Sequence, residues 1–417
     1  MMFRKLVTFE EAKLIISANF RLPNLGEEEV VLLESYNRVL ATDVVSSLDI
    51  PPFNRSTVDG YAVRAQDTNS ADENEPATLR VTGVITIGEQ PQIKIERGEA
   101  VEIVTGAPIP EGADSVVMIE DTEREDSELK IYVPVTQNEN VMKQGSDIKK
   151  GEAVLKRGKL LGSSEIGVLA ALGMSSVKVS KMPMVAVLST GGEVTEPGKP
   201  LPPGKIYDIN AYSISTAVVE SGGKPVYFGT IPDAEEALSK AMQTAVTSAD
   251  IVITSGGVSV GPRDYTPQIV DSLGKPGVVF SGISVKPGKP TTVGFVREKP
   301  IFALPGHPTS ALLIFYLLAR PLIQQIAGRP VTPMKTVRAA AGSRMFSAKG
   351  RRTFVMVKLM FDESCRLIAD PVESGASGAI TTLAKADGFV EIPENQQFID
   401  ADEEVTVSIF RSVLSTV

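Results

Sequence analysis

In the second half of the chain, short apolar runs alternate with longer amphipathic stretches. Met184–Leu188 and the centre of Asp250–Thr254 are continuously apolar, as is typical of parallel strands buried on both faces. Further strands are predicted at Val226–Phe228, Val278–Phe280, Thr291–Phe295 and Ile301–Ala303, and helices at Asn210–Ser221, Asp233–Ser248, Asp264–Leu273 and Pro308–Ile326. This alternation predicts a doubly wound α/β domain over residues 182–332.

The regions on either side of this domain contain short β-like runs. Val101–Val104 and Val116–Ile119 are rich in β-branched residues and are separated by Gly and Pro, which predicts a β-rich domain over residues 48–145. Residues 333–417 again contain short strands and predict a small C-terminal β domain. The fold class is therefore α/β plus β, in a multidomain chain.

The N-terminal region is predicted to be discontinuous. Amphipathic helices are expected at residues 9–20 and 27–34, and another helix at Ser163–Leu172. Residues 146–181 are too few to fold alone, so we expect them to pack with residues 1–47. The β-rich domain would then be inserted into this first domain.

Composition limits the available chemistry. The 417 residues include one histidine, His307, and one cysteine, Cys365, which exclude multi-His metal centres, internal disulfides and Cys-rich zinc sites. Carboxylates, hydroxyls, lysines, backbone N–H groups and a hard cation remain. The N-terminus lacks a secretory pattern, and the most apolar stretch, Ala311–Ala319, is far shorter than a membrane span. We therefore expect a cytoplasmic protein with no membrane partner.

The net charge of −9 conceals two oppositely charged windows. Residues 64–130 contain 6 basic and 16 acidic residues, a net of −10, and are interpreted as a solvated face rather than a partner site. Residues 262–352 contain 14 basic and 3 acidic residues, a net of +11, interleaved with Gly and Pro loops. Few aromatic residues accompany this basic window, so it favours a small anionic ligand over nucleic acid.

Ligands of doubly wound sheets bind beyond the carboxyl ends of the strands, and the loops predicted there are rich in glycine. The loop after Thr254 contains Gly256, Gly257 and Gly261 and leads into the helix predicted at Asp264. Such a loop suits a phosphate or another oxyanion. It matches neither the Walker A motif nor the dinucleotide fingerprint, and a single glycine loop is more often a tight turn. Several at one edge favour a binding site.

Charged residues accompany these loops. Glu193, Asp233 and Asp264 would place three carboxylates near one edge, which suits Mg²⁺ bridging to substrate phosphates. The alternative for Asp233 and Asp264 is helix N-capping. Lys286 and Lys289 lie in a rigid Lys-Pro-Gly-Lys-Pro loop that suits contact with an oxyanion, although exposed lysine is the common structural alternative. His307, in a Pro-Gly-His-Pro turn, is more often structural than catalytic.

Two stiff, polar loops outside this domain also stand out. Residues 51–62 combine two prolines, an aromatic residue and the Asp59-Gly60 turn, and residues 105–114 form a Gly- and Pro-rich loop between predicted strands. Both are explained by turn chemistry alone, but binding surfaces also use such loops.

Together these segments closely resemble the molybdopterin molybdenumtransferase family, which includes the E domain of gephyrin. Each motif is weak alone, whereas nine in the family's order are specific and cover most of the chain. They run from Pro51 to Pro393 as PPFNRSTVDGYAV, IVTGAPIPEGADSVVMIE, QGSDIKKGE, LSTGGEV, TSGGVSVGPRDY, KPGKP, LPGHPTSA, GRR and ADGFVEIP.

The resemblance implies an elongated four-domain homodimer with a site shared between subunits. The discontinuous first domain would serve as its linker and dimerisation domain. Members of the family bind adenylated molybdopterin and molybdate, insert molybdenum at the dithiolene, and release AMP with the help of Mg²⁺. By motif position, the resemblance assigns catalytic roles to Asp59, Thr105, Glu193, Asp233 and Asp264, with Glu193 and Asp264 also holding the metal. It assigns substrate binding to Asp147, Ser255, Gly256, Gly257, Lys286, Lys289, Pro305, Pro308 and Ser310. A molybdopterin adenylyltransferase is a further expected partner.

Departures from the family pattern leave alternatives open. Asn54 stands where Asp is usual, His307 where Asn is common, and Met142-Lys143 where arginines are frequent. These changes are compatible with a tungsten-inserting member. A non-catalytic, gephyrin-like scaffold is a second alternative, and the retained acidic residues argue against it. A pyrophosphate hydrolase with a related α/β domain would explain the glycine loop but not residues 51–62.

Overall fold

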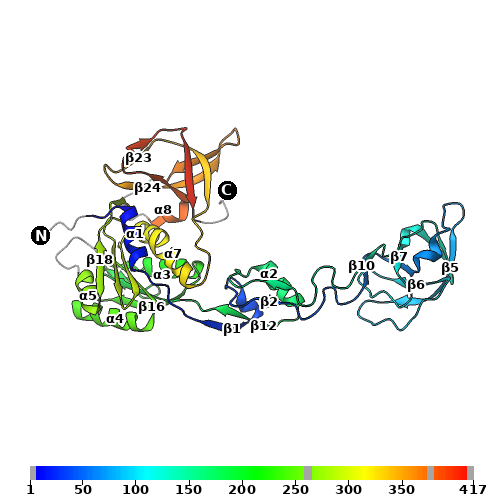
Figure 1. Ribbon diagram of the computed structural model, residues 1–417. Helices are drawn as coiled ribbons and strands as arrows, with labels where there is room; N and C mark the ends of the chain where they lie inside the picture. The colour runs from blue at the N-terminus through cyan, green and yellow to red at the C-terminus, as the bar shows by residue number, and fades with distance from the viewer. Residues whose placement is uncertain (1–5, 258–264, 373–379, 411–417) are drawn as a thin grey trace. The chain divides into compact units, whose positions relative to one another are not determined.

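The computed structural model describes residues 6–257, 265–372 and 380–410. The chain divides into two compact units (Figure 1). Unit 1 comprises Met1–Glu28 and Ser180–Val417, and unit 2 comprises Glu29–Val179. Each unit has its own hydrophobic cores, and each is described separately below.

The centre of unit 1 is a six-stranded sheet in the order β16-β13-β17-β21-β20-β18. Its first four strands are parallel, and β20 is antiparallel to both β21 and β18. The strands are β13 (Met184–Thr190), β16 (Lys224–Ile231), β17 (Ile251–Ser255), β18 (Pro276–Ser281), β20 (Thr292–Val296) and β21 (Lys299–Leu304). Every residue of β17 and β20 is buried, as the continuously apolar runs predict.

Helices cover both faces of this sheet. One face packs against α1 (Phe9–Asn19), α3 (Asn210–Glu220) and the helix running from Pro308 to Ile326. The other face packs against α4 (Glu235–Ser248) and α5 (Thr266–Leu273). The prediction of a doubly wound α/β fold is confirmed.

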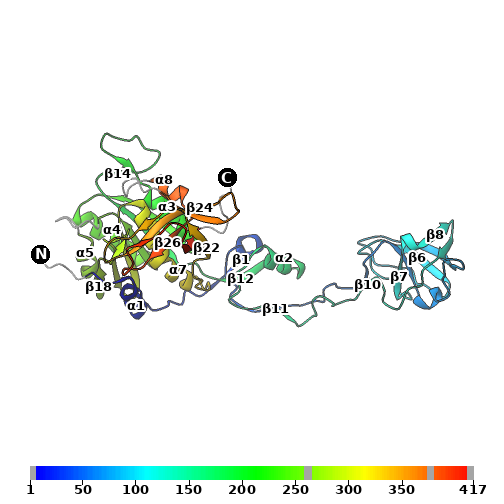
Figure 2. The same ribbon diagram turned by 90° about the horizontal axis from the view of Figure 1, so that it is seen from above.

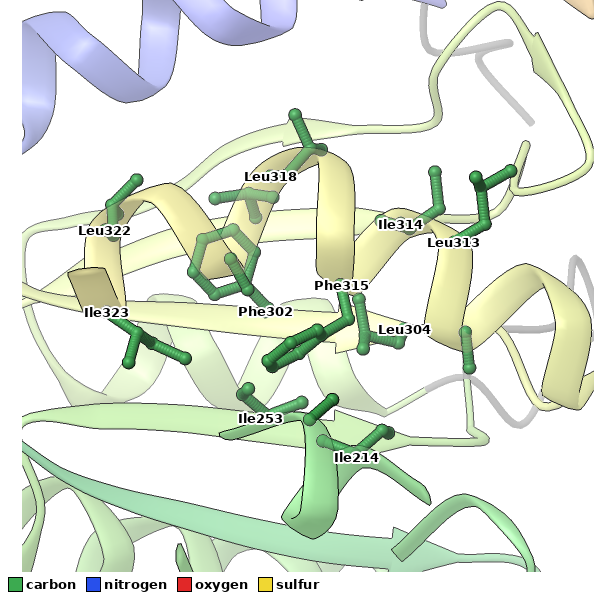
Figure 3. Packing of buried hydrophobic residues seen from close by; sticks show 14 of the residues in the cluster. Ile214, Ile253, Phe302, Leu304, Leu313, Ile314, Phe315, Leu318, Leu322 and Ile323 are labelled. Carbon is green, nitrogen blue, oxygen red and sulfur yellow. The ribbon is translucent and has the colours of Figure 1, made fainter. Parts of the chain in front are cut away.

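The helix from Pro308 to Ile326 consists of α6 (Pro308–Ile314), a π-helical segment (Phe315–Ala319) and α7 (Arg320–Ile326). It is the one helix, among the residues that the structure describes, whose length and composition would allow it to cross a membrane. Figure 3 shows Phe315 lying between this helix and the sheet, close to Ile253 and Leu304. Packing in a protein core therefore accounts for its apolar composition.

The C-terminal part of unit 1 is a closed β barrel. Its strands follow the order β19-β24-β25-β22-β28-β26, and β24 pairs with β26 as well, which closes the ring. The bounds are β19 (Val285–Lys286), β22 (Thr336–Ala341), β24 (Arg352–Phe361), β25 (Leu367–Pro371), β26 (Gly388–Ile392) and β28 (Glu404–Ile409). Since β19 lies between β18 and β20 in the chain, it joins the barrel directly to the α/β sheet.

Unit 2 contains a six-stranded sheet in the order β7-β4-β6-β5-β9-β8. These strands are β4 (Gly60–Val63), β5 (Ala77–Ile85), β6 (Glu99–Ile103), β7 (Ser115–Met118), β8 (Thr122–Glu125) and β9 (Glu128–Ile131). A separate apolar cluster in this unit includes Leu40 and Val44 together with Leu161, Leu169 and Val177. Segments that precede and follow the β-rich sheet in the chain therefore share one core.

Three elements differ from the sequence predictions. The helix predicted at residues 27–34 is instead strand β1 (Glu27–Val31) and a 3₁₀ turn (Leu32–Ser35), because β1 pairs with β12 (Ser176–Ser180). Sheet pairing here outweighs the helix propensity of Glu and Leu. The predicted N-cap at Asp233 is wrong, since α4 begins at Glu235 and its N-cap is Ala234. Helix α1, grouped by sequence with residues 1–47, packs in the core of unit 1 through Phe9, Ala12 and Ile16.

Candidate active site

The loops predicted to bind the ligand lie at one edge of the α/β sheet. Parallel strands β13, β17 and β21 end at Thr190, Ser255 and Leu304, and their register pairs Ser255 with Ser189 on one side and with Leu304 on the other. The backbone N–H of Gly256 donates to the carbonyl of Leu304 at 3.3 Å. The loops that follow β17 and β21 therefore leave the sheet together, as expected for a ligand edge.

Glycine is required where these loops approach β13. Gly256 and Gly257 have φ values of +89° and +66°. A Cβ on Gly256 would lie 2.2 Å from the carbonyl oxygen of Thr190, and one on Gly257 would lie 2.8 Å from the Thr190 hydroxyl. The backbone therefore takes a path that other residues cannot follow without strain.

The loop after β21 supplies a second set of predicted binding residues. Pro305 is buried, Pro308 is the first residue of α6, and Ser310 is buried in the first turn of the same helix. His307 is the N-cap residue of α6, but its side chain makes no capping hydrogen bond. All four residues follow Leu304 and so lie at the same edge as Gly256.

Lys286 and Lys289 belong to the same edge by topology. Antiparallel β20 begins at Thr292, which pairs with Ala303 at the end of β21, so the chain between β18 and β20 turns at this edge. Both lysine side chains are exposed, and Lys286 lies in β19, which pairs with β24 of the barrel. This pairing fixes the loop backbone while leaving the ammonium groups accessible to an anion.

Of the three carboxylates predicted at this edge, the structure describes Glu193 and Asp233. Glu193 follows β13, and its exposed carboxylate folds back toward Gly191, where a Cβ would lie 2.8 Å from Oε2. Figure 2 shows the loop that carries β14 (Val194–Thr195) projecting from the α/β part of unit 1. Asp233 is exposed just after β16, and Asp264 lies outside the described residues.

The structure tests whether these groups fit a magnesium ion. Among residues 6–257, 265–372 and 380–410, no three His, Cys, Asp or Glu side chains are grouped so that they could hold a metal. Mg²⁺ is commonly bound by one or two carboxylates together with substrate phosphates and water. An exposed Glu193 beside the glycine loops fits that kind of site, in which the substrate supplies further oxygen ligands.

In unit 2, the structure brings Asp59 and Thr105 together. Both the backbone N–H and the hydroxyl of Thr105 donate to Asp59 Oδ1, at 2.7 and 2.9 Å. These two bonds lower the pKa of Asp59, the backbone N–H having the larger effect. Asp59 is therefore an oriented, ionised carboxylate on an exposed loop of unit 2.

Asp147, the other site residue predicted in unit 2, lies in an exposed turn. Its backbone N–H donates to the carbonyl of Ile50 at 3.0 Å. Nearby, the side chain of Asn54, one of the departures from the family pattern, accepts the backbone N–H of Gln144 at 2.9 Å. Asn54 therefore holds the chain just before Asp147.

One polar residue at the sheet edge, Asn210, belongs to none of the motifs in the sequence. Asn210 begins α3, and its side-chain Nδ2 donates to Ser255 Oγ and to the carbonyl of Gly306, both at 2.7 Å. The sequence indicated only a helix start at this position. A polar residue there is ordinarily interpreted as a cap, and no local signal distinguishes one that bridges two distant loops.

A second buried group supports the start of α3. Asp208 accepts the backbone N–H of Ala211 and the hydroxyl of Tyr227, both at 3.0 Å. Burial, together with the Asp208 carboxylate, raises the pKa of Tyr227 to about 12. The tyrosine hydroxyl therefore remains protonated and continues to donate to Asp208 at neutral pH.

Proteins of known structure share this fold. Two crystal structures of molybdopterin biosynthesis MoeA proteins from Pyrococcus horikoshii are similar over nearly the whole chain. One has a TM-score of 0.82 and 42% identity and covers 98% of this chain and 100% of its own. The other has a TM-score of 0.80 and 30% identity and covers 97% and 100%. The fold is thus that of the MoeA-like multidomain proteins.

Sequence relatives give the family. The chain is 35% identical to a molybdopterin molybdenumtransferase of Haemophilus influenzae, covering 93% of this chain and 95% of the relative. It is 33% identical to one of Nostoc sp., covering 95% and 92%. Three family descriptions match: "MoeA N-terminal region (domain I and II)" at 7–173, "Probable molybdopterin binding domain" at 186–325 and "MoeA C-terminal region (domain IV)" at 338–410. The chain belongs to the molybdopterin molybdenumtransferase family, which confirms the resemblance seen in its motifs.

Proposed function

We propose that this protein is a molybdopterin molybdenumtransferase that inserts molybdate-derived molybdenum into adenylated molybdopterin and releases AMP. The observation that supports it best is the shared sheet edge, where the Gly256-Gly257 loop, the Pro305-Gly306 loop and the lysine loop meet. An adenylated pterin carries a pyrophosphate, which suits backbone N–H groups and lysines. Molybdate is itself an oxyanion that needs the same partners.

The roles of the residues follow from their chemistry. Lys286 and Lys289 hold anionic groups of the two substrates as mobile point charges, and Ser255 and the glycine loop bind phosphate oxygens. Glu193, with Asp264, would hold Mg²⁺, and a bound Mg²⁺ would shield the charge of the pyrophosphate. Insertion exchanges molybdate oxygens for the two dithiolene sulfurs, so it requires no protein nucleophile. A site without cysteine and with one histidine is therefore sufficient.

Assembly and location are further parts of the proposal. We expect a homodimer in which Asp59 and Thr105 of one subunit complete the site formed by the sheet edge of the other. The protein would act in the cytoplasm, with a molybdopterin adenylyltransferase supplying its substrate. The same proposal divides the chain into four domains. The first combines residues 1–47 and 146–181, and the others are residues 48–145, 182–332 and 333–417.

The direct test is to incubate the purified protein with adenylated molybdopterin, Mg²⁺ and molybdate and to measure AMP release and active cofactor. We expect AMP in a molar ratio of one to the cofactor formed, and loss of both products with Lys286→Ala. A second arm with tungstate separates molybdenum insertion from tungsten insertion. The absence of AMP, under conditions in which a known family enzyme produces it, would contradict catalysis and favour a scaffold role.

A further inference from the structure

We propose that Asn210 is a positioning residue, which orients the hydroxyl of Ser255 toward the anionic ligand and links the two loops that bind it. This inference rests on the proposed function and concerns the same sheet edge. Asn210 is 8% exposed, and Ser255 is 3% exposed. Both residues are thus held in the protein interior, directly beneath the ends of the strands.

The orientation of the Asn210 amide follows from its partners. The carbonyl oxygen of Gly306 can only accept, so the atom 2.7 Å from it must be the amide nitrogen. Ser255 Oγ, also 2.7 Å from that nitrogen, then accepts its second proton. Both N–H bonds of one amide are therefore used to connect the loop after β17 with the loop after β21.

The hydrogen bond to Ser255 determines what its hydroxyl can do. A serine hydroxyl has one proton to donate and two lone pairs. Because a lone pair is occupied by the amide N–H, the O–H bond points away from Asn210 and can donate to a phosphate oxygen. The other N–H engages the Gly306 carbonyl, whose negative end would otherwise repel an anion at this edge.

The position of Asn210 is itself fixed. The backbone N–H of Ala211 donates to the Asp208 carboxylate, and that carboxylate also accepts the hydroxyl of Tyr227 from β16. The backbone N–H of Ser213 donates to Ile209 at 3.0 Å. The first turn of α3 is thus anchored to strand β16 of the sheet.

The amide oxygen of Asn210 indicates that this arrangement has a cost. Within the described ranges, Oδ1 is buried and has no hydrogen-bond partner. A buried polar atom without a partner is unfavourable, and the two bonds that the amide nitrogen donates offset this cost. An apolar residue of similar size would avoid the cost but could not orient Ser255.

The test is a double-mutant cycle on the binding of AMP, measured by isothermal titration calorimetry in the presence of Mg²⁺. We expect Asn210→Ala to weaken AMP binding by about 10-fold, the loss expected for one oriented hydrogen bond to a charged group. Ser255→Ala should have a similar effect. In the Ser255→Ala background, Asn210→Ala should change the affinity by less than about 2-fold, because its action passes through the missing hydroxyl.

Two controls separate orientation from folding. Asn19→Ala removes an amide that donates to the Ile15 carbonyl of its own helix, α1, and should leave AMP affinity unchanged. Asn210→Asp keeps the size of the side chain but cannot donate, and should weaken binding at least as much as Asn210→Ala. If Asn210→Ala does not fold, Asn210→Ser replaces it in the cycle. The serine hydroxyl has one proton, so it cannot donate to both Ser255 Oγ and the Gly306 carbonyl as the asparagine amide does.

The outcomes are distinguishable. An Asn210→Ala protein that binds AMP as tightly as wild type overturns the inference, and so does an equal loss in both Ser255 backgrounds. A wild-type protein that does not bind AMP at all contradicts the proposed function, and the inference falls with it.

Discussion

At the scale of single residues, the Asp59–Thr105 pair shows how a stiff loop orients a carboxylate. Thr105 donates twice to Oδ1 of Asp59, which leaves Oδ2 available to a ligand. The same arrangement occurs at Glu139, which accepts the backbone N–H and the hydroxyl of Thr136 at 2.7 and 2.8 Å. Glu139 belongs to none of the predicted sites. The Glu139–Thr136 pair can therefore serve as a control for experiments on the Asp59–Thr105 pair.

We expect Thr105→Val to raise the pKa of Asp59 toward its ordinary value, because it removes one of the two bonds that lower it. Stabilisation by this carboxylate is present above its unfolded-state pKa and is lost as the pH falls through the lowered folded-state pKa. Because its folded-state pKa is higher, the Thr105→Val variant should lose this stabilisation at a higher pH than the wild type as the pH falls. NMR titration of the Asp59 carboxyl carbon measures the change.

The matched control is Thr136→Val, which should raise the pKa of Glu139 and leave that of Asp59 unchanged. An Asp59 pKa that does not move in Thr105→Val would show that the backbone N–H alone sets it.

Gly256 gives a second prediction at this scale. Gly256→Ala should destabilise the protein by about 3–4 kcal/mol, because it adds a left-handed backbone penalty and a contact 2.2 Å from Thr190 O. Gly198 has the same φ of +89°, but a Cβ added there would meet no atom within 4 Å, so Gly198→Ala should cost only about 1 kcal/mol. Urea denaturation of both variants measures the difference, and equal losses would contradict the proposed close approach.

At this scale, a contiguous motif can be recognised from the sequence, whereas a contact between distant positions cannot. The role of the Gly256-Gly257 loop in binding an oxyanion and that of the stiff turn at Asp59 stay predictions, but both positions were recognised from the sequence. Asn210 was not, because its partners Ser255 and Gly306 lie 45 and 96 positions away in the chain. Only the register of the parallel strands brings them together, and register is a property of the folded sheet.

At the scale of elements, the helix from Pro308 to Ile326 links the sheet edge beyond Leu304 to the core. Its first turn carries Ser310 at the edge, and Phe315, completely buried, contacts the sheet one turn later (Figure 3). We expect Phe315→Ala to cost about 3–5 kcal/mol of stability through the cavity it creates. Exposed Gln325→Ala on the same helix should change stability by less than about 0.5 kcal/mol. Thermal and urea denaturation test both, and a small loss for Phe315→Ala would show that the core can collapse around it.

Helices and strands can be predicted from sequence where the pattern of buried residues and the intrinsic propensity of the residues favour the same structure. The strands of the α/β sheet are apolar and β-branched, and the amphipathic helices between them have one clear apolar face, so both could be assigned from sequence. Residues 27–34 combine glutamates with Val and Leu, and here the pairing partner, β12, lies about 150 positions away. Helix α4 begins later than predicted because Pro232 and the extended Ala234 precede it.

At the scale of the whole molecule, the charge of the chain is divided between its two units. The acidic window, residues 64–130, belongs to unit 2, and the basic window, residues 262–352, belongs to unit 1, as does the edge of the α/β sheet. Outside the acidic window, the chain has 42 − 6 = 36 basic and 51 − 16 = 35 acidic residues. The net charge of −9 therefore describes unit 2 and gives no reason to expect that anions are repelled from the sheet edge.

A site shared between subunits makes a quantitative prediction about mixed dimers. Asp59→Ala should inactivate the part of the site contributed by unit 2, and Lys286→Ala the part contributed by unit 1. If two such proteins exchange subunits at random, half of the dimers are mixed, and each mixed dimer has one intact site of two. The mixture should then regain about a quarter of wild-type AMP release, although each variant alone is inactive.

The matched control combines Asp59→Ala with Thr105→Ala, two changes in the same part of the site. Every site in their mixed dimers carries one of the two defects, so no activity should return. Subunit exchange is verified by tagging one variant and recovering the other with it. Mixed dimers of Asp59→Ala and Lys286→Ala that form but remain inactive would contradict the shared site, because complementation requires the two parts to come from different chains.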